Sequence, residues 1–186
     1  MSKMTQTFGV AAMLATLTLA ATPLPAQTEP GQSDPLIKSA VDASGHFKGL
    51  FTKAAEQMSE EDYAFKPTPE VRSFGQLLAH VADTNYWFCA AVKGETQPVS
   101  GLEKSKTTRA DIQKALAESF TYCDGAYADM TDAKARTMVE FMGKPRPALA
   151  VLFFRTHHAA SHYGNVVTYM RLRGKVPPSS QPRSQE

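Results

Sequence analysis

The chain has 186 residues and a formal net charge of +2, which predicts one domain that is long enough to bury a core. The charged residues are spread along the chain, and no basic block alternates with aromatic residues. We therefore expect neither a nucleic-acid partner nor binding to an anionic membrane surface.

Residues 1–26 have the pattern of a secretory signal peptide. A lysine precedes an apolar, threonine-containing stretch at 8–21, and Ala26 offers a small residue for cleavage, although Leu24 stands where a second small residue is preferred. The stretch is too short and too rich in threonine for a good membrane span; the alternative is an N-terminal anchor that is not cleaved. We predict an exported protein, periplasmic or secreted, with no membrane span after signal removal and a flexible segment at 27–33.

The first two helices are predicted from apolar periodicity and from their end signals, and no segment shows a long β alternation. The first helix is expected to begin at Pro35, with the preceding Ser33 or Asp34 as its cap. The second opens with the spacing Ser73-x-x-Gln76, which is typical of a capping box, and ends at a glycine.

The third and fourth helices follow a polar connection. The third is expected to begin around Thr108, and the fourth follows the sequence "KPRP" and stops at Gly174. Residues 131–147 are read either as a short extended piece or as a loop. Four helices of about 20 residues each predict an all-α four-helix bundle over 34–178, followed by a disordered tail at 179–186.

Two histidines lie one turn apart in the fourth predicted helix. At about 100° per residue from Val151, His158 and His162 fall in the middle of the predicted inward face. Buried imidazoles need partners for their ring nitrogens, and one divalent metal ion can satisfy both rings. His80 lies at the edge of the apolar arc of the second helix, where it can face a neighbouring helix. Three neutral imidazoles and one open position match a catalytic type of zinc site, and nickel or iron is also acceptable.

The residues leave an alternative open, in which the three histidines are structural and hydrogen bond to tyrosine or asparagine. Several metal-site classes are excluded. Ala159 occupies the position at which an HExxH metalloprotease has its glutamate, and the chain contains neither the Glu-x-x-His of di-iron bundles nor the CxxCH of covalent haem sites.

Three segments resemble the DinB-like family of four-helix-bundle proteins, which is related to thiol S-transferases: "EEDYAFKPTPEVRSFG", "RSFGQLLAHVADTNYWFC" and "HHAASHYGNVVTYMRLRGKVPP". The family's signature is one histidine in the second helix and H-x-x-x-H in the fourth, followed by Gly and often by Gln or Asn. The matching residues here are His80, His158, His162 and Gly164-Asn165, and the resemblance covers roughly residues 34–178.

The resemblance implies an up-down-down-up bundle, a divalent metal ion (usually zinc or nickel) bound by the three histidines, and frequent homodimers. It does not imply one reaction, because some members transfer low-molecular-weight thiols such as bacillithiol or mycothiol and many have no assigned activity. The predicted export would take this chain out of the cytosol, where such thiols are normally held.

The family order also bears on the two cysteines. It makes the second and third helices parallel, so that Cys89 and Cys123 lie at similar heights. We expect two buried free thiols, with a disulfide as the alternative in an oxidising compartment.

We therefore predict an exported protein that binds a divalent metal ion. It is expected to act as a metal-dependent hydrolase or transferase, in which the metal ion activates water or a thiol for reaction with an unidentified small molecule. Candidates for proton transfer or for orienting the ligands are Asp83, Tyr163 and Tyr169; their ordinary interpretation is a solvated acid and two packed tyrosines. The alternative functions are a non-catalytic metal-binding protein and a ligand-binding or structural protein of the cell envelope.

Overall fold

The computed structural model describes residues 34–182. The predicted signal peptide at 1–26 and the segment 27–33 lie outside the described residues. The elements are α1 (Pro35–Gln57), α2 (Glu60–Ala64), α3 (Phe74–Lys93), α4 (Leu102–Ser105), α5 (Arg109–Ala128), η1 (Lys134–Arg136), β1 (Met138–Phe141), β2 (Lys144–Pro147), α6 (Ala148–Leu172) and η2 (Pro178–Ser180). Among the helices of this part of the chain, none is long and apolar enough to cross a membrane.

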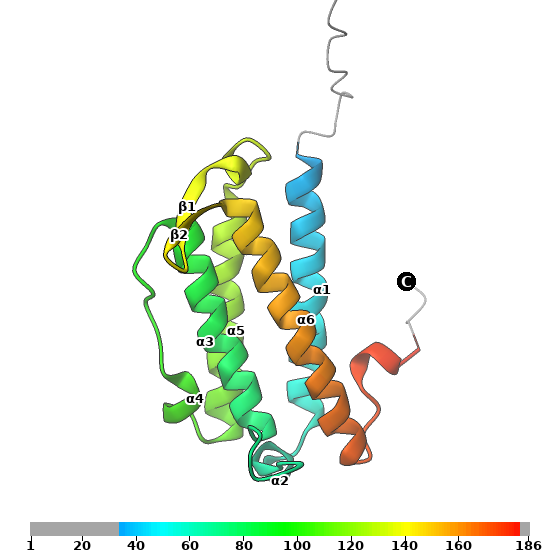
Figure 1. Ribbon diagram of the computed structural model, residues 1–186. Coiled ribbons are helices and arrows are strands. Elements are labelled where there is room, and N and C mark those ends of the chain that lie inside the picture. The colour runs from blue at the N-terminus through cyan, green and yellow to red at the C-terminus, as the bar shows by residue number, and fades with distance from the viewer. Residues whose placement is uncertain (1–33, 183–186) are drawn as a thin grey trace, which may run out of the picture. The chain divides into compact units, whose positions relative to one another are not determined.

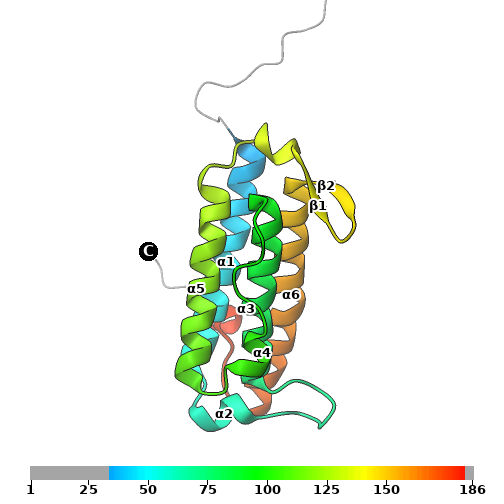
Figure 2. The same ribbon diagram turned by 90° about the vertical axis from the view of Figure 1, so that its left-hand side faces the viewer.

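The four long helices form the predicted all-α bundle. In Figures 1 and 2, α1 and α6 run in one direction and α3 and α5 in the other, which is the up-down-down-up order. The helix α3 packs against α5 and α6, and α1 packs against the same two helices. Because α3 and α5 are parallel, the chain returns along the bundle through the connection that contains α4.

The segment 131–147, left open by the sequence, contains an antiparallel hairpin. Strands β1 and β2 pair from Met138 opposite Pro147 to Phe141 opposite Lys144. Phe141 is buried against Phe88 of α3 and Val151 of α6. The hairpin therefore covers the end of the α3–α6 seam.

The predicted helix ends are confirmed for α3, α5 and α6. Ser73 and Gln76 form both hydrogen bonds of a capping box, at 3.1 and 2.9 Å. Thr108 caps α5 through its side chain. Gly94 and Gly174 follow α3 and α6 with φ angles of 68° and 69°, values that favour glycine.

The start of α1 is capped differently from the prediction. The side chain of Asp34 makes no cap hydrogen bond to its own helix. Instead, the carboxylate of Asp132 accepts the backbone N–H groups of Leu36 and Ile37, and the N–H of Asp132 donates to the Asp34 carboxylate. The segment after α5 thus holds the beginning of α1.

The phase of α6 also differs from the prediction. The prediction places His158 and His162 in the middle of the inward face, but Arg155 is only 2% exposed, whereas Phe154 is 41% exposed. The middle of the buried face is formed by Arg155, Ala159 and Tyr163, and the two histidines of this helix lie half-buried beside it. Arg155 donates to Asn85 Oδ1 and to the Ser44 hydroxyl, so the bundle has a polar layer at its centre.

Cys89 and Cys123 form a disulfide, so the expectation of two free thiols is wrong. The bond joins α3 to α5, and both residues are buried. Parallel packing of the two helices brings the two Cα atoms to 5.3 Å, which lies within the normal range for a disulfide.

Close packing between α3 and its neighbours is most evident at Gly75. A Cβ atom at this position would lie 2.9 Å from Ile112 Cδ1 and 3.2 Å from the carbonyl oxygen of Tyr63. Glycine therefore allows α3 to begin close to α2 and α5.

Candidate metal centre

Three histidines from two helices meet on one side of the bundle. The ring centroids are separated by 4.3 Å for His158 and His162, 4.8 Å for His80 and His162, and 5.3 Å for His80 and His158. Each ring offers one nitrogen, and these nitrogens lie within 4.8 Å of one another. The structure thus brings together the three histidines singled out in the sequence, in a cluster that could hold a metal ion.

The neighbours of His80 and His158 determine which ring nitrogen carries the proton. The Thr84 hydroxyl lies 3.0 Å from two helix carbonyl oxygens, to which it donates, so it can only accept from His158 Nδ1 at 3.4 Å. His80 Nδ1 lies 3.3 Å from Glu103 Oε2, and a carboxylate can only accept. In both rings the lone pair is therefore at Nε2, the nitrogen free to bind a metal ion.

His162 completes the set. Its Nε2 lies 3.0 Å from Nε2 of His158, and its buried Nδ1 has no hydrogen-bond partner within residues 34–182. The lone pair of His158 Nε2 faces His162 Nε2, so either a proton on His162 Nε2 or a cation lies between the two nitrogens. Tetrahedral zinc with bonds of 2.0–2.1 Å holds its nitrogens about 3.3 Å apart. The 3.0 Å between Nε2 of His158 and of His162 is close to this value, and all three donor nitrogens lie within 4.8 Å of one another, so the cluster can close around a divalent ion.

The electrostatic environment keeps the rings neutral. Burial, the other histidines of the cluster and the charge of Arg72 lower the pKa of His158 and of His162 to about 4. Burial and Arg72 also lower the pKa of His80, although Glu103 acts against the shift. Since metal binding requires deprotonated imidazole, no proton has to be displaced at neutral pH.

Asp83, a predicted candidate for proton transfer or for orienting the ligands, acts on the site through Glu103. Its two carboxylate oxygens accept the backbone N–H groups of Leu102 and Glu103, each at 3.0 Å. This contact fixes the start of α4. It thereby places Glu103 beside His80, where a carboxylate can orient the ring.

The two tyrosines have different positions. The hydroxyl of Tyr169 donates to the carbonyl oxygen of Arg72 at 2.7 Å and fixes the loop before α3. The hydroxyl of Tyr163 accepts the backbone N–H of Ser179 at 3.1 Å, and its ring packs on Phe51. Tyr163 therefore attaches the segment after α6, including η2, to the bundle, and the start of the predicted tail has a defined contact.

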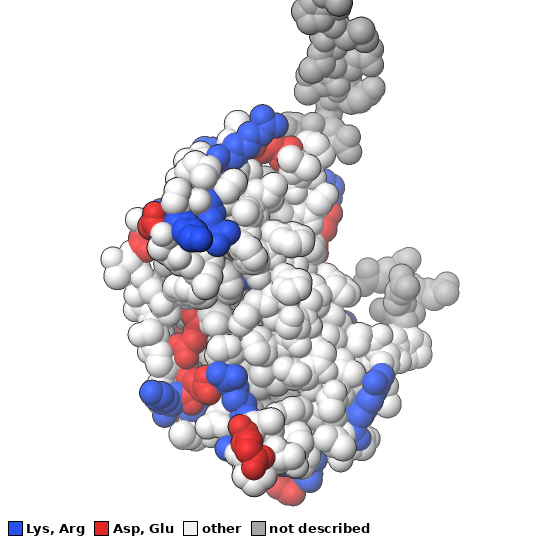
Figure 3. All heavy atoms as spheres, viewed as in Figure 1, with Lys and Arg blue, Asp and Glu red and all other residues white. Residues whose placement is uncertain are grey.

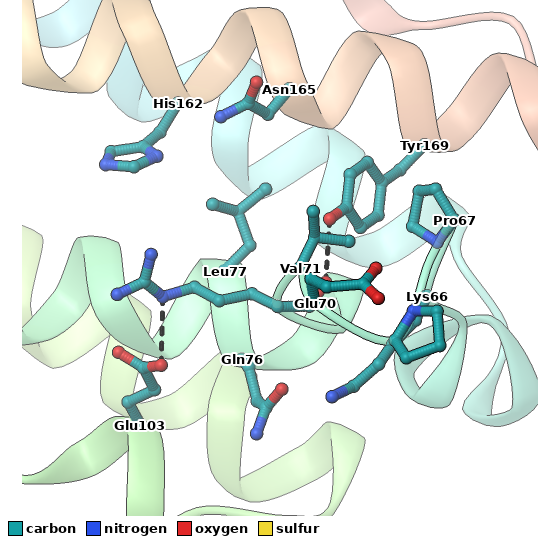
Figure 4. Close-up of a pocket in the computed structure, with 12 residues that line it drawn as sticks. Lys66, Pro67, Glu70, Val71, Gln76, Leu77, Glu103, His162, Asn165 and Tyr169 are labelled. Atoms are coloured by element: carbon teal, nitrogen blue, oxygen red, sulfur yellow. Dashed lines mark hydrogen bonds and ion pairs between the residues drawn. The ribbon is translucent and has the colours of Figure 1, made fainter.

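A cleft of about 600 Å³ opens beside the histidines. His162, Asn165 and Tyr169 point into it from one face of α6 (Figure 4), and the loop before α3 forms the opposite wall. Its lining residues are Lys66, Pro67, Pro69, Glu70, Val71, Arg72, Gln76, Leu77, Glu103, His162, Asn165 and Tyr169. The site is accessible to a small molecule from the side of this loop.

The fold and the cluster define a four-helix bundle with a candidate centre for one divalent metal ion. The chain belongs to the DinB superfamily, whose family model matches residues 48–166. It is 24% identical over 132 residues to the uncharacterized protein YjoA of Bacillus subtilis, a match that covers 68% of this chain and 84% of YjoA.

Solved structures share the fold. A DinB-like protein from Bacillus cereus has a TM-score of 0.68 at 17% identity, with 76% of this chain and 95% of that chain covered. The crystal structure of B. subtilis YjoA has a TM-score of 0.59 at 17% identity and covers 76% and 99%. These likenesses confirm the predicted bundle, and the family model confirms the predicted family.

Proposed function

We propose that this DinB-superfamily protein is an exported, metal-dependent hydrolase or transferase that binds zinc or nickel through His80, His158 and His162. The observation that carries the proposal is the convergence of three neutral imidazoles beside an open cleft. When bound, a divalent ion would supply Lewis acidity and lower the pKa of a coordinated water or thiol.

The protein's own residues have defined roles in this proposal. Glu103 and Thr84 hold the rings of His80 and His158 in the required tautomer and orientation. The cleft binds a small substrate and aligns it with the site, and its volume lies within the range of about 300–1,000 Å³ for small-molecule sites.

Export is supported by two separate features. The signal-peptide pattern at 1–26 is one, and the disulfide between Cys89 and Cys123 is the other, because such bonds persist in oxidising compartments.

A homodimer is also part of the proposal, and the exposed Phe153 and Met142 provide apolar surface for it. Sedimentation of the mature protein tests the dimer.

Turnover by the metal-loaded protein tests catalysis. Zinc-loaded, nickel-loaded and chelator-treated protein would be assayed for hydrolysis of an activated ester and for transfer of a small thiol to an activated aryl electrophile. We expect metal-dependent turnover that is lost in His162→Ala and kept in His157→Ala, whose ring lies exposed outside the cluster. Bound metal without turnover would support the non-catalytic alternative, in which the ion joins α3 to α6.

A further inference from the structure

Arg72 is held in a defined position at the edge of the histidine cluster. Its Nε donates to Glu103 Oε1 at 2.9 Å, and its carbonyl oxygen accepts the Tyr169 hydroxyl. The side chain is 41% exposed and lines the same cleft as His162. The loop before α3 thus presents a fixed guanidinium to the cleft.

The guanidinium retains donors that the protein does not use. Within residues 34–182, Nε is the atom of this group that makes a hydrogen bond, and neither Nη1 nor Nη2 has a partner. These two nitrogens form the end of the planar fork that binds a carboxylate or a phosphate through two parallel hydrogen bonds. Arg72 therefore has free capacity for an anionic group.

The local charges favour an anion at this place. Arg72 lies beside the histidines, because Glu103, whose Oε1 it contacts at 2.9 Å, lies with Oε2 3.3 Å from His80 Nδ1, and because Arg72 and His162 line the same cleft. With a divalent ion bound, its two positive charges and that of Arg72 would face the two negative charges of Glu103 and Asp83. One positive charge would remain in excess. Lys66 and Glu70 also line the cleft, and their opposite charges leave this net charge unchanged.

Figure 3 shows basic and acidic side chains interspersed on the face that it displays, without a large area of one sign. The excess positive charge at the cluster is thus local. A local positive field inside a cleft raises the concentration of anionic ligands there.

We propose that Arg72 recognises the substrate and that the substrate carries a carboxylate or a phosphate, which pairs with its guanidinium beside the three histidines. The amide side chains of Gln76 and Asn165 line the same cleft and can bind further polar groups of such a molecule. This inference rests on the proposed function, because it concerns the substrate of that site.

Anion affinity of the zinc-loaded protein tests the proposal without an activity assay. Acetate and inorganic phosphate would be titrated calorimetrically at constant ionic strength, and the zinc content of every preparation would be measured. We expect the wild type to bind one of these probes, and the preferred probe distinguishes a carboxylate from a phosphate substrate. Arg72→Gln should weaken that binding by about ten- to hundredfold, whereas Lys66→Gln should change it less than about threefold.

Arg72→Lys separates charge from geometry, because lysine retains the charge but lacks the planar fork; we expect it to bind the anion more weakly than the wild type. Equal affinities in the wild type and Arg72→Gln, at equal zinc content, would overturn the assignment of Arg72 and leave the metal centre intact. Zinc-loaded wild type that binds neither probe would also overturn it. A wild type that retains no zinc would overturn the proposed function itself.

Discussion

Reduction of the Cys89–Cys123 disulfide is expected to lower the free energy of unfolding by about 3.8 kcal/mol. The bond joins two helices across a sequence separation of 34 residues. Opening a loop of this size returns about 12.6 cal/mol/K of conformational entropy to the unfolded chain, which gives this value at 25 °C. For a domain of this size, the melting temperature should fall by about 8–15 °C.

Urea unfolding with and without a reductant measures this effect. The double variant Cys89→Ala/Cys123→Ala should resemble the reduced wild type and should not respond to the reductant, which makes it the matched control. A wild type that has both thiols reduced and an unchanged unfolding midpoint would show that the loop-entropy argument is wrong for this bundle.

Three further predictions concern the cluster and the packing. Glu103→Gln should weaken zinc binding by about 10–100-fold in a chelator competition, because it removes the carboxylate that orients a ligand; unchanged affinity would exclude this role. In the metal-free protein, His158 and His162 have a pKa of about 4 compared with 6.5 when unperturbed. The unfolded chain therefore binds more protons than the folded protein between these pH values, and the free energy of unfolding should fall as the pH is lowered from 6.5 to 4. The variant His158→Ala/His162→Ala should show a smaller slope of this free energy against pH. Gly75→Ala should destabilise the bundle by about 1–3 kcal/mol because a Cβ atom has no room there. In contrast, a Cβ atom at Gly45 meets no atom within 4 Å, so Gly45→Ala should stabilise the bundle by about 0.5–1 kcal/mol. Thermal unfolding of both variants tests this, and a higher melting temperature for Gly75→Ala than for Gly45→Ala would contradict it.

Helix ends could be predicted because their signals are local. Ser73 and Gln76 make hydrogen bonds within one turn, so the spacing in the sequence already contains the geometry. The same holds for His158 and His162, which share a helix and are neighbours at a separation of four residues. The position of His80 follows when the second amphipathic helix faces these two histidines in the bundle.

Residues that depend on tertiary contacts could not be found in this way. Glu103 lies in the connection between α3 and α5, where no periodicity indicates its direction, and it reaches His80 because Asp83 holds α4 in place. Arg72 likewise reaches the site from a loop. Thr84 lies one turn from His80, so the spacing places it near the cluster but does not show its contact with His158.

The phase of α6 differs from the predicted one because apolar side chains lie outside and a charged one lies inside. Phe153 and Phe154 are exposed, while Arg155 is buried with neutral partners on α1 and α3. A hydrophobicity pattern cannot predict a charged core residue of this kind. The small residue Ala159, next to His158, is the feature of the sequence that could have indicated the buried face, because the structure places it at the centre of that face.

Metal content is the most direct test of the three-histidine centre. The mature protein, produced without a chelating tag, would be reconstituted with zinc and analysed beside His80→Ala, His158→Ala and the control His157→Ala. We predict about one equivalent of zinc in the wild type and in His157→Ala, and its loss in the two cluster variants. A wild type without metal after reconstitution, or cluster variants that retain a full equivalent, would contradict the assignment.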